Sequence, residues 1–137
     1  MKVVLDSMIW FSYVAHGHGW RHRVIERARK AKVRFFVSDY ILDEVWETLV
    51  TVLGEPRRVA QLARDAILRR AKLVALPRVI PFFVPGDPDD DAVVQTALTA
   101  RADSLVTADK VLLDLGKVRD VEIIDVKTFA ERLPSPR

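Results

Sequence analysis

Four carboxylates spread along the chain, Asp6, Glu44, Asp90 and Asp109, occupy positions where the ends of helices and strands could direct them into one crevice. Carboxylates held close together repel one another, and some of them must take up protons if nothing compensates their charge. A divalent cation removes that repulsion, and hard cations such as Mg²⁺ prefer oxygen ligands. The four residues therefore predict a divalent-metal site.

Two of these acids follow short apolar segments that are typical of buried strands. Residues 1–5 run into Asp6 before a helical stretch, and residues 104–107 deliver Asp109 to the start of a short helix. In an open parallel α/β sheet, ligands bind beyond the carboxyl ends of the strands, where the strand order changes direction. We therefore expect Asp6 and Asp109 to belong to one site.

The other two acids lie on segments with helical periodicity. Glu44 belongs to an amphipathic helix expected over residues 38–53, and Asp90 lies near the start of a helix expected over residues 89–102. Both helices would follow or face the predicted strands. They could bring their acids to the same edge of the sheet.

Helical geometry separates Asp90 from the acids around it. The side chains three, four and seven residues after Asp90 are all apolar, so Asp90 is expected on the inward face of its helix. Asp89 and Asp91 are expected toward the margins of that face. Asp87 is the better N-cap, with Pro88 in the first helical position.

Each acid also has a simpler interpretation. Asp6 or Ser7, and likewise Asp109, could be N-caps whose oxygens accept hydrogen bonds from free helix amides. Glu44 could be an ordinary solvated residue, and the acids around Asp90 could complement a helix dipole. These roles account for single positions, but they do not explain why acids follow both strands.

The rest of the chain alternates strands with helices and predicts an α/β fold with a single domain over residues 1–133. We expect a central, mostly parallel, twisted sheet of four to five strands with helices on both faces, and a frayed tail over residues 134–137. The further strands are expected over residues 33–37, 79–83 and 121–124, and the further helices over residues 20–31, from Pro56 onward, and over residues 126–133.

Composition restricts the class of protein. Half of the 137 residues are hydrophobic, which suffices for one sizeable core. The chain has no cysteine, which excludes disulfides and thiolate zinc sites, and His16, His18 and His22 around two glycines are more typical of a loop than of a metal site. No apolar run approaches the roughly 20 residues of a membrane span, so we expect a cytoplasmic protein without membrane contact.

Basic residues concentrate in two segments, although the net charge is only +3. Residues 21–34 hold seven Arg or Lys against one Glu, and residues 57–72 hold six against one Asp. Basic helices beside an acidic crevice would suit a phosphate backbone, and ordinary solvated helix faces are the alternative. The residues predicted to contact nucleic acid are Arg27, Lys30, Arg57 and Arg58.

Four segments of the chain, taken in order, resemble PIN-domain nucleases. They are residues 3–7, the helix that carries Glu44, residues 90–97, and residues 102–113. The similarity covers almost the whole chain, and it is closest to the small bacterial and archaeal PIN proteins classed as toxins of toxin–antitoxin pairs, which include the VapC-type toxins. Each motif is short, and the specificity comes from four motifs in register.

The resemblance implies a PIN-like domain and assigns roles to particular residues. The family's metal-binding acids fall on Asp6, Glu44, Asp90 and Asp109, and Thr107 is the hydroxyl residue that usually precedes the last acid by two positions. Ser7 is expected to support the site. The implied cofactor is Mg²⁺ or Mn²⁺, and the implied activity is a divalent-metal-dependent endoribonuclease that hydrolyses RNA phosphodiesters.

The resemblance also implies partners, and the sequence shows two departures from the family. A small antitoxin protein would hold the enzyme inactive, and the toxin would form a homodimer. The opening motif usually reads Asp-Thr-Asn or Asp-Ser-Asn, whereas Met8 follows Asp6 and Ser7 here. Ala108 stands where Gly is frequent.

Two other functional classes remain open from the sequence. A catalytically weak or inactive RNA-binding or regulatory module on the same fold would be consistent with Met8. A phosphotransfer protein is the other alternative. A receiver domain would place its phosphoacceptor Asp after the middle strand, and a haloacid-dehalogenase-type phosphatase would need a second Asp two residues after Asp6, where the chain has Met8.

Overall fold

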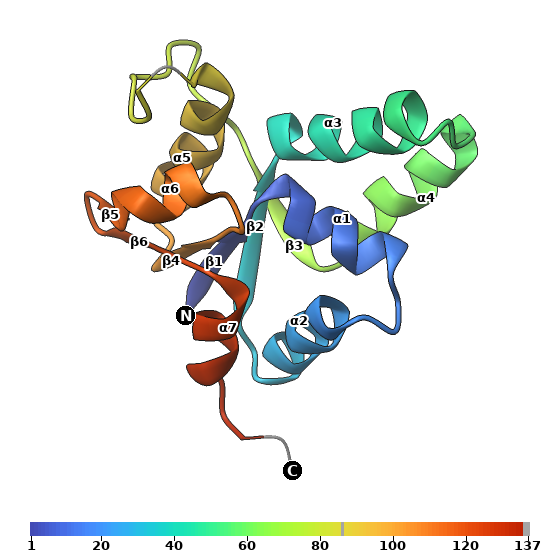
Figure 1. The fold of residues 1–137 in the computed structure, drawn as a ribbon, viewed down its shortest axis with the longest axis horizontal. Coiled ribbons are helices and arrows are strands. Elements are labelled where there is room, and N and C mark those ends of the chain that lie inside the picture. The colour runs from blue at the N-terminus through green and yellow to red at the C-terminus, as the bar shows by residue number, and fades with distance from the viewer. Residues whose placement is uncertain (86, 136–137) are drawn as a thin grey trace.

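A six-stranded sheet forms the centre of the protein in the computed structural model, which describes residues 1–85 and 87–135 (Figure 1). The strands are β1 Lys2–Leu5, β2 Arg34–Ser38, β3 Ala71–Val74, β4 Ser104–Val106, β5 Lys117–Val118 and β6 Val121–Ile124. In space they are ordered β3-β2-β1-β4-β6-β5, and all neighbours pair in parallel except β5 with β6. The predicted α/β class and mostly parallel sheet are confirmed, but the expected four to five strands are too few.

Helices cover both faces of this sheet, as predicted. They are α1 Ser7–Ala15, α2 Trp20–Lys30, α3 Asp39–Glu47, α4 Arg57–Leu68, α5 Pro88–Ala100, α6 Lys110–Leu115 and α7 Val126–Glu131. Figure 1 shows α5 and α6 on one side of the sheet and α1 to α4 on the other. The arrangement follows from parallel strands, which require crossover connections that pack back on the sheet.

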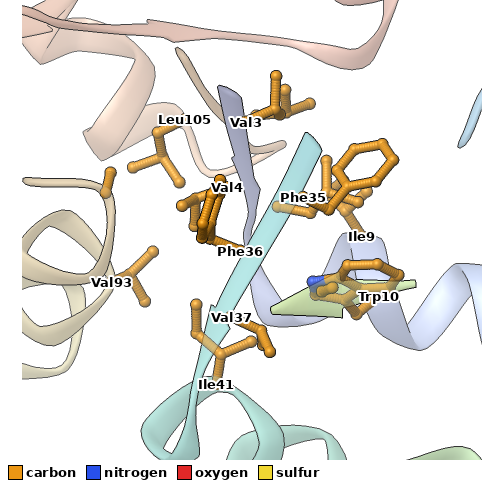
Figure 2. Packing of buried hydrophobic residues seen from close by; sticks show 14 of the residues in the cluster. Val3, Val4, Ile9, Trp10, Phe35, Phe36, Val37, Ile41, Val93 and Leu105 are labelled. Carbon is orange, nitrogen blue, oxygen red and sulfur yellow. The ribbon is translucent and has the colours of Figure 1, made fainter. Parts of the chain in front are cut away.

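Strand β2 shows how one strand contributes to both halves of the core. The ring of Phe35 packs edge-on against Trp10 of α1 and Phe129 of α7, at centroid distances of 5.8 and 6.4 Å. Phe36, the next residue, faces the opposite side, toward Val93 of α5 (Figure 2). All five side chains are buried, as expected for a strand covered on both faces.

The predicted strand over residues 79–83 is wrong. These residues form no regular element, and the edge strand is instead β3, which pairs with β2. Lys72 and Leu73 of β3 are both exposed, so this strand lacks the apolar alternation by which a strand is recognised. The short β5 was also missed, because a two-residue strand has no period to detect.

The helix expected over residues 38–53 is divided in two. Helix α3 ends at Glu47, and a π-helical turn, Thr48–Val52, continues the chain. Gly54 has a φ of +68°, a conformation that glycine adopts without strain, and it turns the chain toward α4. Gly54 therefore ends this segment.

The strand order reverses between β1 and β4. From β1 the chain proceeds to β2 and β3 on one side, and later to β4 and β6 on the other. Leu5 and Val106, the last residues of the two strands, lie opposite each other in the ladder. The carboxyl ends of these strands therefore form the place where a sheet of this type binds ligands.

The last helix lies close to the end of the described chain. Helix α7 ends at Glu131 and Leu133 is buried, so packed residues extend almost to the tail expected over residues 134–137. Of that tail, residues 136–137 lie outside the described residues.

Within residues 1–85 and 87–135, no helix is long and apolar enough to cross a membrane.

Candidate metal centre

Asp6 lies directly beyond the carboxyl end of β1 and is buried, with 9% of its surface exposed. Its backbone amide donates to the carbonyl of Val106 at 2.9 Å, which continues the β1–β4 ladder by one bond. Its Oδ1 accepts a hydrogen bond from the Ser7 amide at 2.7 Å, and the Ser7 hydroxyl lies 3.4 Å away. The carboxylate is thus held at the start of α1.

Thr107 joins Asp6 to Asp109. The buried Thr107 hydroxyl donates to Asp6 Oδ2 at 2.6 Å and accepts from the Asp109 amide at 3.0 Å. Asp109 Oδ1 accepts from the Val111 amide at 2.8 Å, so Asp109 caps α6. Asp6 and Asp109 are therefore helix N-caps and also candidate site residues. A residue that caps a helix directly after a parallel strand lies at the edge of the sheet where ligands bind.

The acidic run at the start of α5 separates into distinct roles. Asp87 caps the helix by accepting from the amides of Asp89 and Asp90, as predicted. Asp90 is buried, and its Oδ2 has no hydrogen-bond partner among the described residues. Asp89 is exposed. One of the run's acids is therefore buried without compensation.

Asp91, which the helical spacing placed toward the margin of the inward face, is fully covered in the structure. It is 3% exposed, and its Oδ1 accepts from the amides of Phe83 and Val84, both at 2.7 Å. The loop before α5 folds back over this side of the helix and buries it. A prediction from the helix alone could not include that loop, which lies in the segment wrongly expected to be a strand.

Glu44 approaches from α3, which follows β2 and is capped by Ser38. The Ser38 hydroxyl also pairs with Thr96 of α5 at 2.8 Å, which ties the start of α3 to α5. Glu44 is half-buried. A cavity of about 460 Å³ receives all four predicted acids, and it is lined by Asp6, Ser7, Met8, Arg21, Glu44, Asp90, Ala108 and Asp109.

The electrostatics of this cavity are those of uncompensated acids. Burial raises the pKa of Asp6, although hydrogen bonds from Thr107 and Ser7 oppose the rise. Burial raises the pKa of Glu44 to about 7. A hydrogen bond with Ser7 lowers this pKa, and the charge of Asp6 raises it further. Burial and the charge of Asp109 raise the pKa of Asp90 to about 7 as well. The charge of Asp6 thus makes ionisation of Glu44 less favourable, and the charge of Asp109 does the same for Asp90.

The donor set fits a hard divalent cation. No three His, Asp or Glu side chains in the described part of the chain are already gathered as a ligand group, and this includes the three histidines. The cavity nevertheless offers mostly oxygen donors, beside the soft thioether of Met8, and one of these oxygens is the unpartnered Asp90 Oδ2. Mg²⁺ and Mn²⁺ accept such donors and retain several waters, so a cation could be held by few direct contacts.

The basic residues predicted to contact nucleic acid do not line this cavity. Arg27 donates to the carbonyl of Ala130 in α7, and Lys30 is exposed farther along α2. Arg57 and Arg58 are exposed at the start of α4. Their contact with nucleic acid stays a prediction.

Arg21, at the start of α2, is the basic residue that does line the cavity. Sequence reasoning missed it as a site residue. It is one of four arginines within α2, and nothing in its spacing distinguishes it from the other three. Its position depends on how α2 packs against α1, which is a tertiary relationship.

Comparison with known proteins agrees with this fold. A family model described as "PIN domain" matches residues 2–111. The solved structure of VapBC2 from Rickettsia felis, bound to a DNA fragment from the promoter of its own genes, includes a chain with a TM-score of 0.66 and 14% sequence identity. The match covers 91% of this chain and 98% of that one. No curated protein matches the sequence.

Proposed function

Since this chain belongs to the PIN-domain family, we propose that it is a divalent-metal-dependent endoribonuclease, the toxin of a toxin–antitoxin pair. One observation carries the proposal. Carboxylates from four separate segments, Asp6, Glu44, Asp90 and Asp109, line a single cavity at the point where the strand order reverses. A fold can hold many functions, so the site has to support the activity.

These four acids would hold Mg²⁺ or Mn²⁺, directly or through water. When bound, such a cation lowers the pKa of water and neutralises charge on the scissile phosphate and the leaving oxygen. The buried, unpartnered Asp90 Oδ2 and the raised pKa values of Glu44 and Asp90 support this assignment, because each reports negative charge without a partner.

The chain's own side chains position the acids and orient water. Thr107 and the Ser7 amide fix both oxygens of Asp6, and the α6 cap fixes Asp109. Glu44, whose pKa of about 7 belongs to the metal-free cavity, would orient the attacking water by a hydrogen bond. Burial of Asp6 and Asp90 limits the water that competes for these contacts.

We further propose a small antitoxin protein as partner, a homodimer as the assembled state and the cytoplasm as its location. The support for the antitoxin is the fold similarity to a chain of the VapBC2 complex. A short reading frame beside this gene would support the antitoxin, and co-expression of the two products, followed by affinity purification of either protein, tests the partner. Light scattering of the purified protein tests the dimer.

The experiment that tests the activity is cleavage of structured and unstructured RNA by the purified protein, in Mg²⁺, in Mn²⁺ and in chelator. We expect cleavage with either metal and none in chelator. Equal cleavage in chelator would contradict the metal-dependent assignment. A DNA substrate of the same sequence in parallel tests the preference for RNA.

A second function is favoured by one observation. Met8 lines the cavity with 49% of its surface exposed, so an apolar side chain lies beside the acids. An RNA-binding module with weak or no catalysis would tolerate this residue. Binding of RNA without cleavage in any metal would support this alternative over the nuclease.

A further inference from the structure

We propose that Arg21 binds a phosphate of the RNA strand that lies across the acidic cavity, and that Ser12 positions it there. This inference rests on the proposed function, since it names the contact between that site and its substrate. Two neighbouring helices carry it. Arg21 comes from the start of α2 and Ser12 from α1, and α1 also presents Ser7 and Met8 to the cavity.

The guanidinium of Arg21 is held in place by a short chain of hydrogen bonds. Its Nη1 donates to the Ser12 hydroxyl at 3.0 Å, and that hydroxyl donates to the carbonyl of Met8 at 3.0 Å. Arg21 is therefore tied to the same turn of α1 that borders the acids. A tethered side chain loses less conformational entropy when it binds a ligand than a free one does.

Arg21 retains most of its donor capacity. A guanidinium has five N–H groups in a planar fork, and one hydrogen bond from Arg21 is found within the described residues. No ion pair joins Arg21 to an acid in this part of the chain, even though four acids line the same cavity. Its charge is thus not consumed by the neighbouring carboxylates.

The arrangement of opposite charges suits a phosphodiester. A strand that crosses the cavity presents negative phosphates, and a bound cation would reduce the repulsion between these phosphates and the acids. Arg21 supplies a fixed positive charge at the same cavity, with a geometry that matches two phosphate oxygens. Arg23 and Arg27 of the same helix donate instead to the carbonyls of His18 and Ala130, so they do not duplicate this role.

The test uses the full chain and a short fluorescein-labelled single-stranded RNA of mixed sequence. Binding is measured in chelator over a series of salt concentrations, and KM and kcat are measured with Mn²⁺. Arg21→Gln should weaken binding roughly tenfold, because a charged hydrogen bond is lost. It should also lower the salt slope by roughly 0.7, as expected when one phosphate contact to a single strand is lost.

Two further variants and one matched control sharpen this test. Arg21→Lys keeps the positive charge but not the planar guanidinium, so it should lose part of the binding. Ser12→Ala should raise KM by a smaller factor than Arg21→Gln does, with little change in kcat. The control is Arg69→Gln, the same change at an exposed residue that follows α4, beside the amino ends of β2 and β3 and away from the cavity. Equal melting temperatures show that the variants fold.

The outcomes separate this inference from the proposed function. RNA cleavage by the wild type, combined with unchanged binding and KM in Arg21→Gln, overturns the role of Arg21 and leaves the nuclease standing. An equal loss in Arg69→Gln also overturns it, because the effect would then belong to overall charge. A wild type that neither binds nor cleaves RNA overturns both proposals.

Discussion

The hydroxyl of Thr107 donates to Asp6 Oδ2 at 2.6 Å and thereby connects two residues that are 101 positions apart. The Thr107 hydroxyl oxygen also accepts a hydrogen bond from the backbone amide of Asp109. The Thr107 side chain therefore fixes the relative positions of the two acids. Asp6 is buried, and this hydrogen bond opposes the rise of its pKa. The contact therefore serves both the geometry and the charge of the cavity.

Replacement of Thr107 tests this contact. Thr107→Val keeps the shape but removes the donor to Asp6, and we expect cleavage to fall by about 10- to 100-fold, as for lost support of metal-ligating groups. Asp6 Oδ2 and the Asp109 amide would each lose a hydrogen-bond partner, which should also cost about 1–3 kcal/mol of stability. Thr107→Ser is the matched control and should retain most of the activity. Equal activity of the Val and Ser variants would show that the hydroxyl has no role in the site.

The first and last acids can be tested by isosteric changes. Asp6→Asn and Asp109→Asn should each abolish cleavage, because each removes a charge from the cavity. Asn also caps helices, so α1 and α6 should form normally and circular dichroism should be unchanged. Undiminished cleavage by either variant would exclude the nuclease assignment at this site.

The acidic run of α5 should divide into functional and structural residues. Asp90→Asn should lose most of the activity with little loss of stability. Asp91→Ala should instead cost about 1–3 kcal/mol, since the part-buried amide of Phe83 and the buried amide of Val84 lose their acceptor. Asp87→Ala should cost about 1 kcal/mol through the lost cap. Cleavage assays and urea unfolding separate the two effects, with Asp89→Asn as the exposed control.

If Asp89→Asn, Asp90→Asn and Asp91→Asn lost the same fraction of activity, the run would act only as a diffuse negative patch. The assignment of Asp90 as a metal-site acid would then be wrong.

The raised pKa values predict how the stability of the metal-free protein depends on pH. Glu44 rises from an ordinary value of 4.5 to about 7, and Asp90 from 3.8 to about 7. Between these values the native state binds more protons than the unfolded chain, so these groups lower the free energy of unfolding as pH rises from about 4 to about 7. Their contribution is constant above and below this window.

Urea unfolding in chelator, repeated across this pH range, measures that slope. The double variant Glu44→Gln with Asp90→Asn should flatten it, and Mg²⁺ should stabilise the wild type more at the alkaline end, where the ligands are ionised. An identical pH slope in wild type and double variant would show that neither acid titrates abnormally.

Met8 can be exchanged for the residue that the resemblance leads one to expect. Because Met8 is half-exposed, Met8→Asn should leave stability within about 0.5 kcal/mol. A polar group beside Asp6 should raise the cleavage rate, by roughly tenfold if it supports the bound cation. A lower rate in Met8→Asn would show that the apolar side chain contributes to substrate contact.

Much of the cavity could be predicted from the sequence because its acids stand at element boundaries. Asp6 and Asp109 follow strands with a clear apolar pattern, and the ends of parallel strands meet at one edge. Asp91 could not be placed, because its burial depends on the loop before α5. Strand β3 was missed since an edge strand with exposed Lys72 and Leu73 lacks the alternating pattern.

The reversal of strand order between β1 and β4 has a consequence for synthesis on the ribosome. Asp6 is translated early, whereas Thr107 and Asp109 arrive much later, and β1 lacks its neighbour β4 until then. A nascent chain can therefore hold three of the acids without the hydroxyl and the fourth acid that complete the cavity. The cavity that gathers the four acids is thus complete only after β4 has emerged and paired with β1.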